Sequence, residues 1–126
     1  MKRLPLAWAL VAATGLLILH ASAAPQDDLD PVKVSPQTVK VLFENEWVRV
    51  LEAKVPPSGH EPKHRHLPGV AVFLTHLEVE SVSFPDGKVA KTHRKFGAAL
   101  WHEPTVHEVR NVGKTPVHTI RVELKD

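Results

Sequence analysis

The sequence has 126 residues, with 16 lysines and arginines against 14 acidic residues, nine histidines and no cysteine. This length is sufficient for one domain with a modest hydrophobic core. The absence of cysteine excludes disulfides and thiolate ligands, so a metal would need histidine, carboxylate or amide ligands. No basic patch interleaved with aromatic residues occurs, and we therefore expect no nucleic-acid partner.

Residues 1–23 are typical of a secretory signal peptide. Lys2 and Arg3 form a basic head, residues 4–19 are mostly apolar, and the small residues 21–23 resemble a cleavage site. We predict cleavage after Ala23, export to the bacterial periplasm, and no membrane association afterwards. The alternative is a retained anchor helix, although the apolar run is short for a membrane span.

Residues 24–38 are polar and contain proline, and we expect an extended leader that is either mobile or docked as an arm. Residues 39–126 are expected to form an all-β domain of eight or nine short strands separated by turn residues. The expected strands are 39–43, 47–55, 62–66, 70–74, 77–84, 89–94, 98–101, 106–111 and 117–124.

Two of these strands have an expected phase. In 117–124, Ile120, Val122 and Leu124 are expected to point inward, with Arg121 and Glu123 outward. In 47–55 the apolar alternation slips at Leu51, which predicts a β-bulge at that position.

The segment 59–66 contains three histidines close together. Alternate residues of a strand share a face, so His64 and His66 would project together, about 7 Å apart along the backbone, while Arg65 points away. Neutral imidazoles at this spacing can converge on Zn, Fe, Cu or Ni. We predict that this pair is the first half of a metal site and that His107 is the second half.

Several segments of the sequence, by their order and spacing, resemble the cupin superfamily, specifically its short single-domain members. The resemblance covers residues 41–125. It rests on an initial hairpin, a first histidine motif, a central hairpin, a second motif with a His-x-x-x-Asn core, and a typical ending: 44–51, 62–66, 84–88, 97–111 and 122–125.

The resemblance implies an RmlC-like jelly-roll barrel (a double-stranded β-helix) with one divalent metal in its mouth. His64, His66 and His107 match the ligand positions of the two motifs, and Asn111 matches a structural position. The usual glutamate ligand is missing, because Val70 and Ala71 occupy the places where it would stand. A three-histidine site is therefore expected, as in the iron, zinc or nickel members of the superfamily.

Further residues are candidates for the pocket. His60 lies near the expected barrel mouth, His118 shares the expected inward phase of its strand, and Trp101 precedes the loop of the second motif. Each also has a structural interpretation: a solvated turn residue, a hydrogen-bonded core histidine and a core aromatic residue. His102 could also line the pocket, but a surface loop residue is the preferred interpretation.

The functional hypothesis is a secreted cupin that binds Fe, Ni, Zn, Cu or Mn and acts on a small molecule, either as a dioxygenase or by Lewis-acid chemistry. A second hypothesis is a non-catalytic module that binds a sugar or acid. A third is a periplasmic metal buffer. Because cupins commonly pair through their sheets and residues 39–43 could extend a neighbouring sheet edge, we expect a homodimer.

Overall fold

The computed structural model describes residues 28–126, and the predicted signal peptide lies outside that range. Within it, no helix combines the length and apolar character needed to cross a bilayer. The described residues form one helical turn and nine strands: α1 (Pro31–Val34), β1 (Val39–Glu44), β2 (Val48–Val55), β3 (His60–His66), β4 (Gly69–Phe73), β5 (Leu77–Ser83), β6 (Val89–Arg94), β7 (Ala99–His102), β8 (Thr105–Asn111) and β9 (Val117–Leu124).

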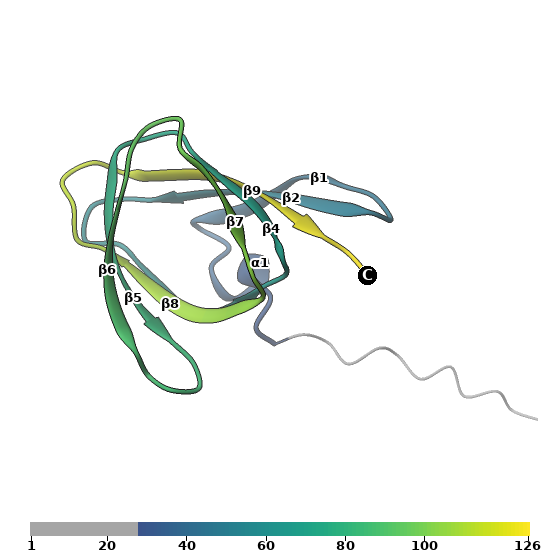
Figure 1. Cartoon of the computed structure of the whole chain (residues 1–126), viewed down its shortest axis with the longest axis horizontal. Helices are drawn as coiled ribbons and strands as arrows, with labels where there is room; N and C mark the ends of the chain where they lie inside the picture. The colour runs from purple at the N-terminus through teal and green to yellow at the C-terminus, as the bar shows by residue number, and fades with distance from the viewer. Residues whose placement is uncertain (1–27) are drawn as a thin grey trace, which may run out of the picture.

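The strands form two antiparallel sheets. The five-stranded sheet has the order β1-β2-β9-β4-β7, and the four-stranded sheet has the order β3-β8-β5-β6. The two sheets face each other and enclose a barrel, while the β1–β2 hairpin extends beyond it (Figure 1). The last strand, β9, pairs between β2 and β4, so segments that are distant in the sequence become neighbours. The predicted all-β jelly roll is confirmed.

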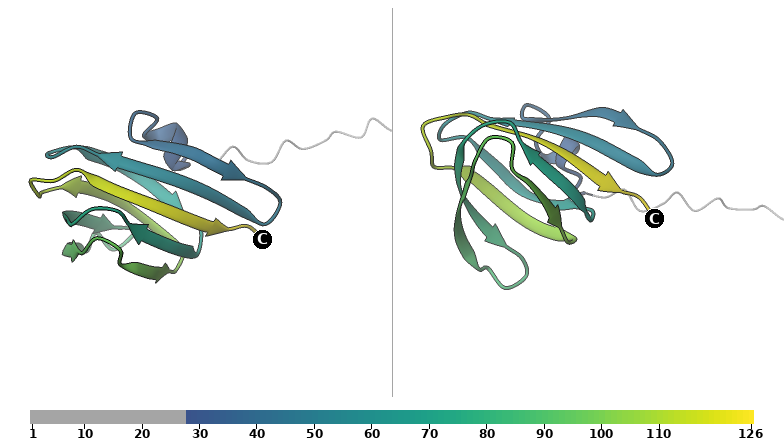
Figure 2. Two further views of the ribbon diagram at one scale, coloured as in Figure 1. Left: turned by 90° about the horizontal axis from the view of Figure 1, so that it is seen from above. Right: turned by 45° about the horizontal axis from the view of Figure 1, so that its top comes forward.

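The segment before β1 is docked on the domain. Asp30 caps α1 by accepting a hydrogen bond from the Val32 amide at 3.0 Å, and Pro31 is buried at the first helical position. The Arg65 amide donates to the Leu29 carbonyl at 2.8 Å, which ties this arm to β3. Residues 28–38 therefore form a docked arm that contains a helical turn, rather than a wholly extended leader. Figure 2 shows α1 beside β1.

The predicted phase of β9 is wrong. Val117, Thr119 and Arg121 line the interior cavity, whereas Ile120 and Val122 belong to the opposite face. Both faces of this strand carry apolar residues, so alternation alone does not identify the inner one.

An apolar row on the outside of the five-stranded sheet explains this reversal. Val50 pairs with Val122, Val122 with Val70, and Val70 with Trp101, which aligns four strands in register. Residues that pair directly across strands lie on the same face of a sheet. The side chains of this row point away from the cavity.

The expected bulge at Leu51 is also absent. β2 pairs with β9 without a register shift, and the irregularity lies in β1, between Val41 and Phe43. The inward face of β2 carries Leu51 and Val55, both of which are buried.

The hydrophobic core occupies the part of the barrel interior next to the cavity. Its buried cluster comes from four strands and consists of Val55, Ala71, Phe73, Leu77 and Val117. Phe73, Leu77 and Val117 also line the cavity. The core therefore supplies the apolar wall of the space into which the polar side chains project.

Candidate metal centre

A bulge in β3 turns three polar side chains inward. The pairing between β3 and β8 shifts between Glu61 and His64, so one additional residue is accommodated there. Glu61, His64 and His66 are consequently all buried, although Glu61 and His64 are three residues apart. Pro62 lies in this irregular stretch, where its missing amide hydrogen costs no ladder hydrogen bond.

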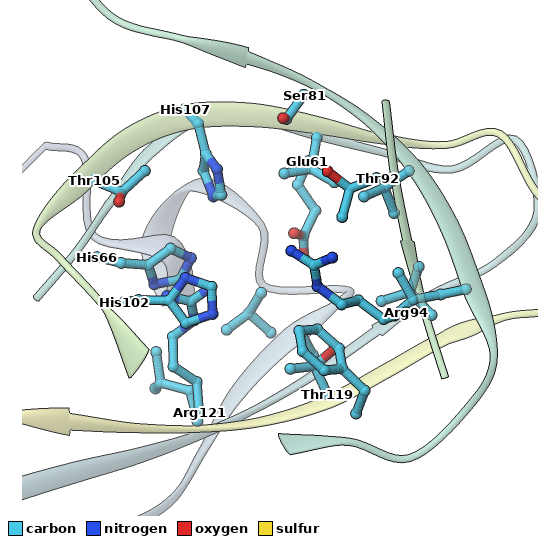
Figure 3. A pocket seen from close by; sticks show the side chains of 18 residues that line it. Glu61, His66, Ser81, Thr92, Arg94, His102, Thr105, His107, Thr119 and Arg121 are labelled. Carbon is cyan, nitrogen blue, oxygen red and sulfur yellow. The ribbon is translucent and has the colours of Figure 1, made fainter. Parts of the chain in front are cut away.

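The three predicted metal-ligating histidines come together. His64 lies directly opposite His107 in the β3–β8 pairing, and their Nε2 atoms are 3.1 Å apart. The Nε2 atoms of His64 and His66 are also 3.1 Å apart, and the potential ligand atoms of all three lie within 4.8 Å of one another. In Figure 3, His66 and His107 point into the cavity.

The hydrogen bonds behind the rings determine which nitrogen is free. The Nδ1 atom of His64 lies 2.7 Å from the Pro62 carbonyl oxygen, which can only accept, so Nδ1 carries the proton. The Nδ1 atom of His66 lies 2.6 Å from Oε1 of Glu123, and donates to that carboxyl group when it is ionised. Both rings then present the unprotonated Nε2 atom to the centre.

This arrangement fits a metal ion. Two unprotonated nitrogens 3.1 Å apart cannot hydrogen-bond to each other, whereas both can donate lone pairs to one cation. Zinc–nitrogen bonds of about 2.1 Å with angles of 90–109° give nitrogen–nitrogen separations of about 3.0–3.4 Å. Among the described residues this is the one group of three or more potential ligand side chains this close together, and it contains no carboxylate.

Burial keeps these imidazoles neutral. Desolvation is the largest cause that lowers the pKa of His66 well below its usual range, lowers that of His64, and lowers that of His107 to about 3. Desolvation likewise raises the pKa of the Glu123 carboxyl group to about 7. Neutral imidazole is the form that binds metals, so the site is ready for a ligand role at neutral pH.

A cavity of about 190 Å³ adjoins the histidines. Polar side chains line it on several sides, together with apolar residues of the core. The polar lining consists of Glu61, His66, Ser81, Thr92, Arg94, His102, Thr105, His107, Thr119 and Arg121 (Figure 3).

Three of the further candidates lie outside this cavity. His60 stands before the β3 bulge on the opposite face from Glu61, and its side chain is partly exposed. His118 faces outward, where its Nε2 atom is 2.8 Å from Oε1 of Glu52. Trp101 is 54% exposed and belongs to the outer apolar row.

Asn111 has the structural position that the resemblance implied. Its side chain is 1% exposed, and its Nδ2 atom donates to the carbonyl oxygens of Val55 and Thr115 at 3.0 and 2.9 Å. Its Oδ1 atom accepts from the Gly113 amide at 3.0 Å. Asn111 thus holds the turn after β8 against β2.

Sequence reasoning missed several residues of the site. Arg121 lines the cavity and Glu123 lies behind His66, and both were expected outside because they alternate with apolar residues of β9. His102, for which a surface loop position was preferred over a place in the pocket, lines the cavity from β7, and Arg94 does so from β6. A signal existed only for His102, which lies within the segment that resembles the second cupin motif.

Comparison with solved structures identifies cupins with similar folds, among them the following three. A cupin domain from Bordetella pertussis matches with a TM-score of 0.64 and 28% identity over 70% of this chain and 92% of that chain. An RmlC-like cupin with a double-stranded β-helix from Methanocaldococcus jannaschii matches with a TM-score of 0.55 and 16% identity over 68% and 77%. A cupin 2 conserved barrel protein from Salinispora arenicola has a TM-score of 0.53 and 20% identity over 80% and 82%.

Comparisons of the sequence itself find no such relative. No family model matches the chain, and no curated protein matches it.

Proposed function

This chain has the fold of the cupin superfamily, and from that premise we propose that it binds one divalent metal ion through His64, His66 and His107. The metal would lie beside the interior cavity and act on a small molecule bound there. The convergence of the three Nε2 atoms is the observation that carries this proposal.

A divalent ion held by three histidines supplies a Lewis acid, or a redox centre if it is iron, with coordination positions left for a substrate. The protein's own residues orient and shield it. The Pro62 carbonyl and the Glu123 carboxyl group each hold one imidazole ring. The surrounding strands bury these rings, which keeps them neutral and limits the access of water.

The small-ligand binding module is the second candidate. The cavity offers hydrogen-bonding and charged groups on several strands, and these could hold a ligand without any metal. The metal-buffer hypothesis has less support, because the other histidines of the described segment belong to no further group of three potential ligands.

The decisive test is metal content. We expect the purified mature protein to bind about one equivalent of Fe, Ni, Zn, Cu or Mn, measured by elemental analysis and by titration after chelation. His64→Ala and His107→Ala should each abolish stoichiometric binding. His93→Ala is the matched control, since the His93 side chain is largely exposed and lies outside the group.

The outcomes separate the candidates. Loss of metal in both site variants but not in the control supports the three-histidine centre and justifies a substrate screen that follows oxygen uptake. No metal uptake by the wild type would instead favour the binding module. Several equivalents per chain that survive the site substitutions would favour the buffer.

A further inference from the structure

Two buried nitrogen atoms at the cavity have no hydrogen-bond partner within residues 28–126. They are Nη1 of Arg121 and Nε2 of His102. Both side chains line the cavity, where they group with His66 at one side (Figure 3). A buried donor without a partner is costly, and a guanidinium is the costliest case because its charge is also desolvated. Burial accordingly lowers the pKa of Arg121 to about 10.

The nearby carboxyl groups are already engaged. Glu61 accepts a hydrogen bond from the Thr38 hydroxyl at 3.0 Å, and Glu123 is bound to His66. Neither forms an ion pair within 4.0 Å of Arg121 in the described part of the chain. The electrostatic influence of both glutamates still favours the charged form of Arg121. The guanidinium therefore stays cationic and has hydrogen-bonding capacity left for a ligand.

A second arginine points into the same space. Arg94 extends from β6 toward the centre of the cavity (Figure 3), with its guanidinium 5.9 Å from the centroid of the Phe73 ring. The positive charges of these two arginines balance the negative charges of Glu61 and Glu123 in and beside the cavity. The dication of the proposed function would then leave an excess of positive charge, and an anionic ligand would neutralise part of it.

We infer that the cavity binds a small monocarboxylic acid, with its carboxylate on Arg121 and its short apolar body against the core wall. The guanidinium fork matches a carboxylate in geometry and charge. Leu51, Val109 and Val117 are among the apolar residues that line the remaining space. At about 30 Å³ per water molecule, 190 Å³ has room for about six waters, which suits an acid of a few carbons.

This inference rests on the proposed function for the position of the acid beside the metal, but the arginine belongs to the chain itself. We therefore test it first on metal-free protein. Butyrate and butyramide have nearly the same size and differ in charge, and binding of each is measured by calorimetry or NMR titration. We expect saturable 1:1 binding of butyrate and an affinity for butyramide that is weaker by roughly tenfold or more.

Arg121→Gln tests the assignment to this residue. We expect it to lower the affinity for butyrate to that for butyramide. Arg110→Gln is the matched control, because Arg110 is exposed on β8 and should leave butyrate binding unchanged. Thermal melts establish that each variant is folded. If Arg121→Gln does not fold, Arg121→Lys, which keeps the charge but not the fork, should weaken butyrate binding while retaining a preference over the amide.

Several results would overturn the inference: equal binding of butyrate and butyramide, no saturable binding of either, or an unchanged preference in folded Arg121→Gln. Tighter binding of inorganic phosphate than of butyrate would overturn the carboxylate assignment. A protein that takes up no metal yet prefers butyrate through Arg121 would contradict the proposed function alone. A protein that binds metal without this preference would contradict the inference alone.

Discussion

Glu123 should control metal affinity although it is not a proposed ligand. Its side chain is 2% exposed, and its Oε1 atom lies 2.6 Å from Nδ1 of His66. This contact directs Nε2 of His66 toward the other two imidazoles. In Glu123→Ala the ring loses its acceptor, so it can rotate or place its proton on Nε2. Glu123→Gln keeps an oxygen acceptor but loses the charge.

The expected loss of zinc affinity follows from the hydrogen bond between His66 and Glu123. A hydrogen bond to a charged group contributes about 1.5–3 kcal/mol, and each 1.4 kcal/mol changes an equilibrium constant about tenfold. We therefore expect zinc affinity to fall about tenfold in Glu123→Gln and about a hundredfold in Glu123→Ala. This range agrees with the loss of about ten- to a hundredfold that is typical when a residue supporting a metal-bound histidine is removed.

The assay is competition for zinc with a chromophoric chelator at neutral pH, together with a thermal melt of each variant. Glu108→Gln is the control, because Glu108 lies 3.8 Å from the partly exposed His60 and outside the histidine group. A folded Glu123→Ala protein with wild-type zinc affinity would refute the reasoning, since neither the orientation of His66 nor its role as a ligand would then matter.

Four further predictions concern stability, assembly and processing. Gly69→Ala should lower the free energy of unfolding by about 2–3 kcal/mol, because its Cβ would overlap a carbonyl oxygen of the adjacent β9, and an unchanged urea midpoint would contradict this. Hydrogen bonding to Lys40, the largest cause, lowers the pKa of Glu52 from 4.5 to about 2. The stabilisation by Glu52 is thus present above pH 4.5 and lost as the pH falls toward 2. In Glu52→Gln, the free energy of unfolding measured with urea should therefore fall less steeply between neutral pH and about pH 3 than in the wild type. An equally steep fall in the variant would argue against this role of Glu52. We propose a homodimer through the outer apolar row, for which light scattering should give twice the chain mass. Val70→Glu should reduce the measured mass to that of one chain. A monomeric wild type would exclude the dimer. We also propose export with cleavage after residue 23, so mass spectrometry of the exported protein should find Ala24 first, and a retained N-terminus would contradict this.

Local sequence patterns predicted the strands and the histidine group well. Alternation along β3 placed His64 and His66 on one face, because side chains of a strand alternate regardless of what surrounds it. Turn residues also delimited the nine strands, because the backbone preferences of glycine, proline, asparagine and aspartate are local properties. The combination of His107 and Asn111 came from the cupin resemblance, and the structure places both on β8, with His107 beside its expected partner His64.

Tertiary structure alone decided which side of β9 faces inward, and with it the surroundings of the site. The sequence of this strand has two faces, of which Ile120 and Val122 made one look like core. Only the pairing of β9 between β2 and β4 turns those residues to the outer face of the five-stranded sheet and brings Arg121 and Glu123 inside. The physical reason is that strand alternation defines two faces, whereas the packing of distant strands determines which face is buried.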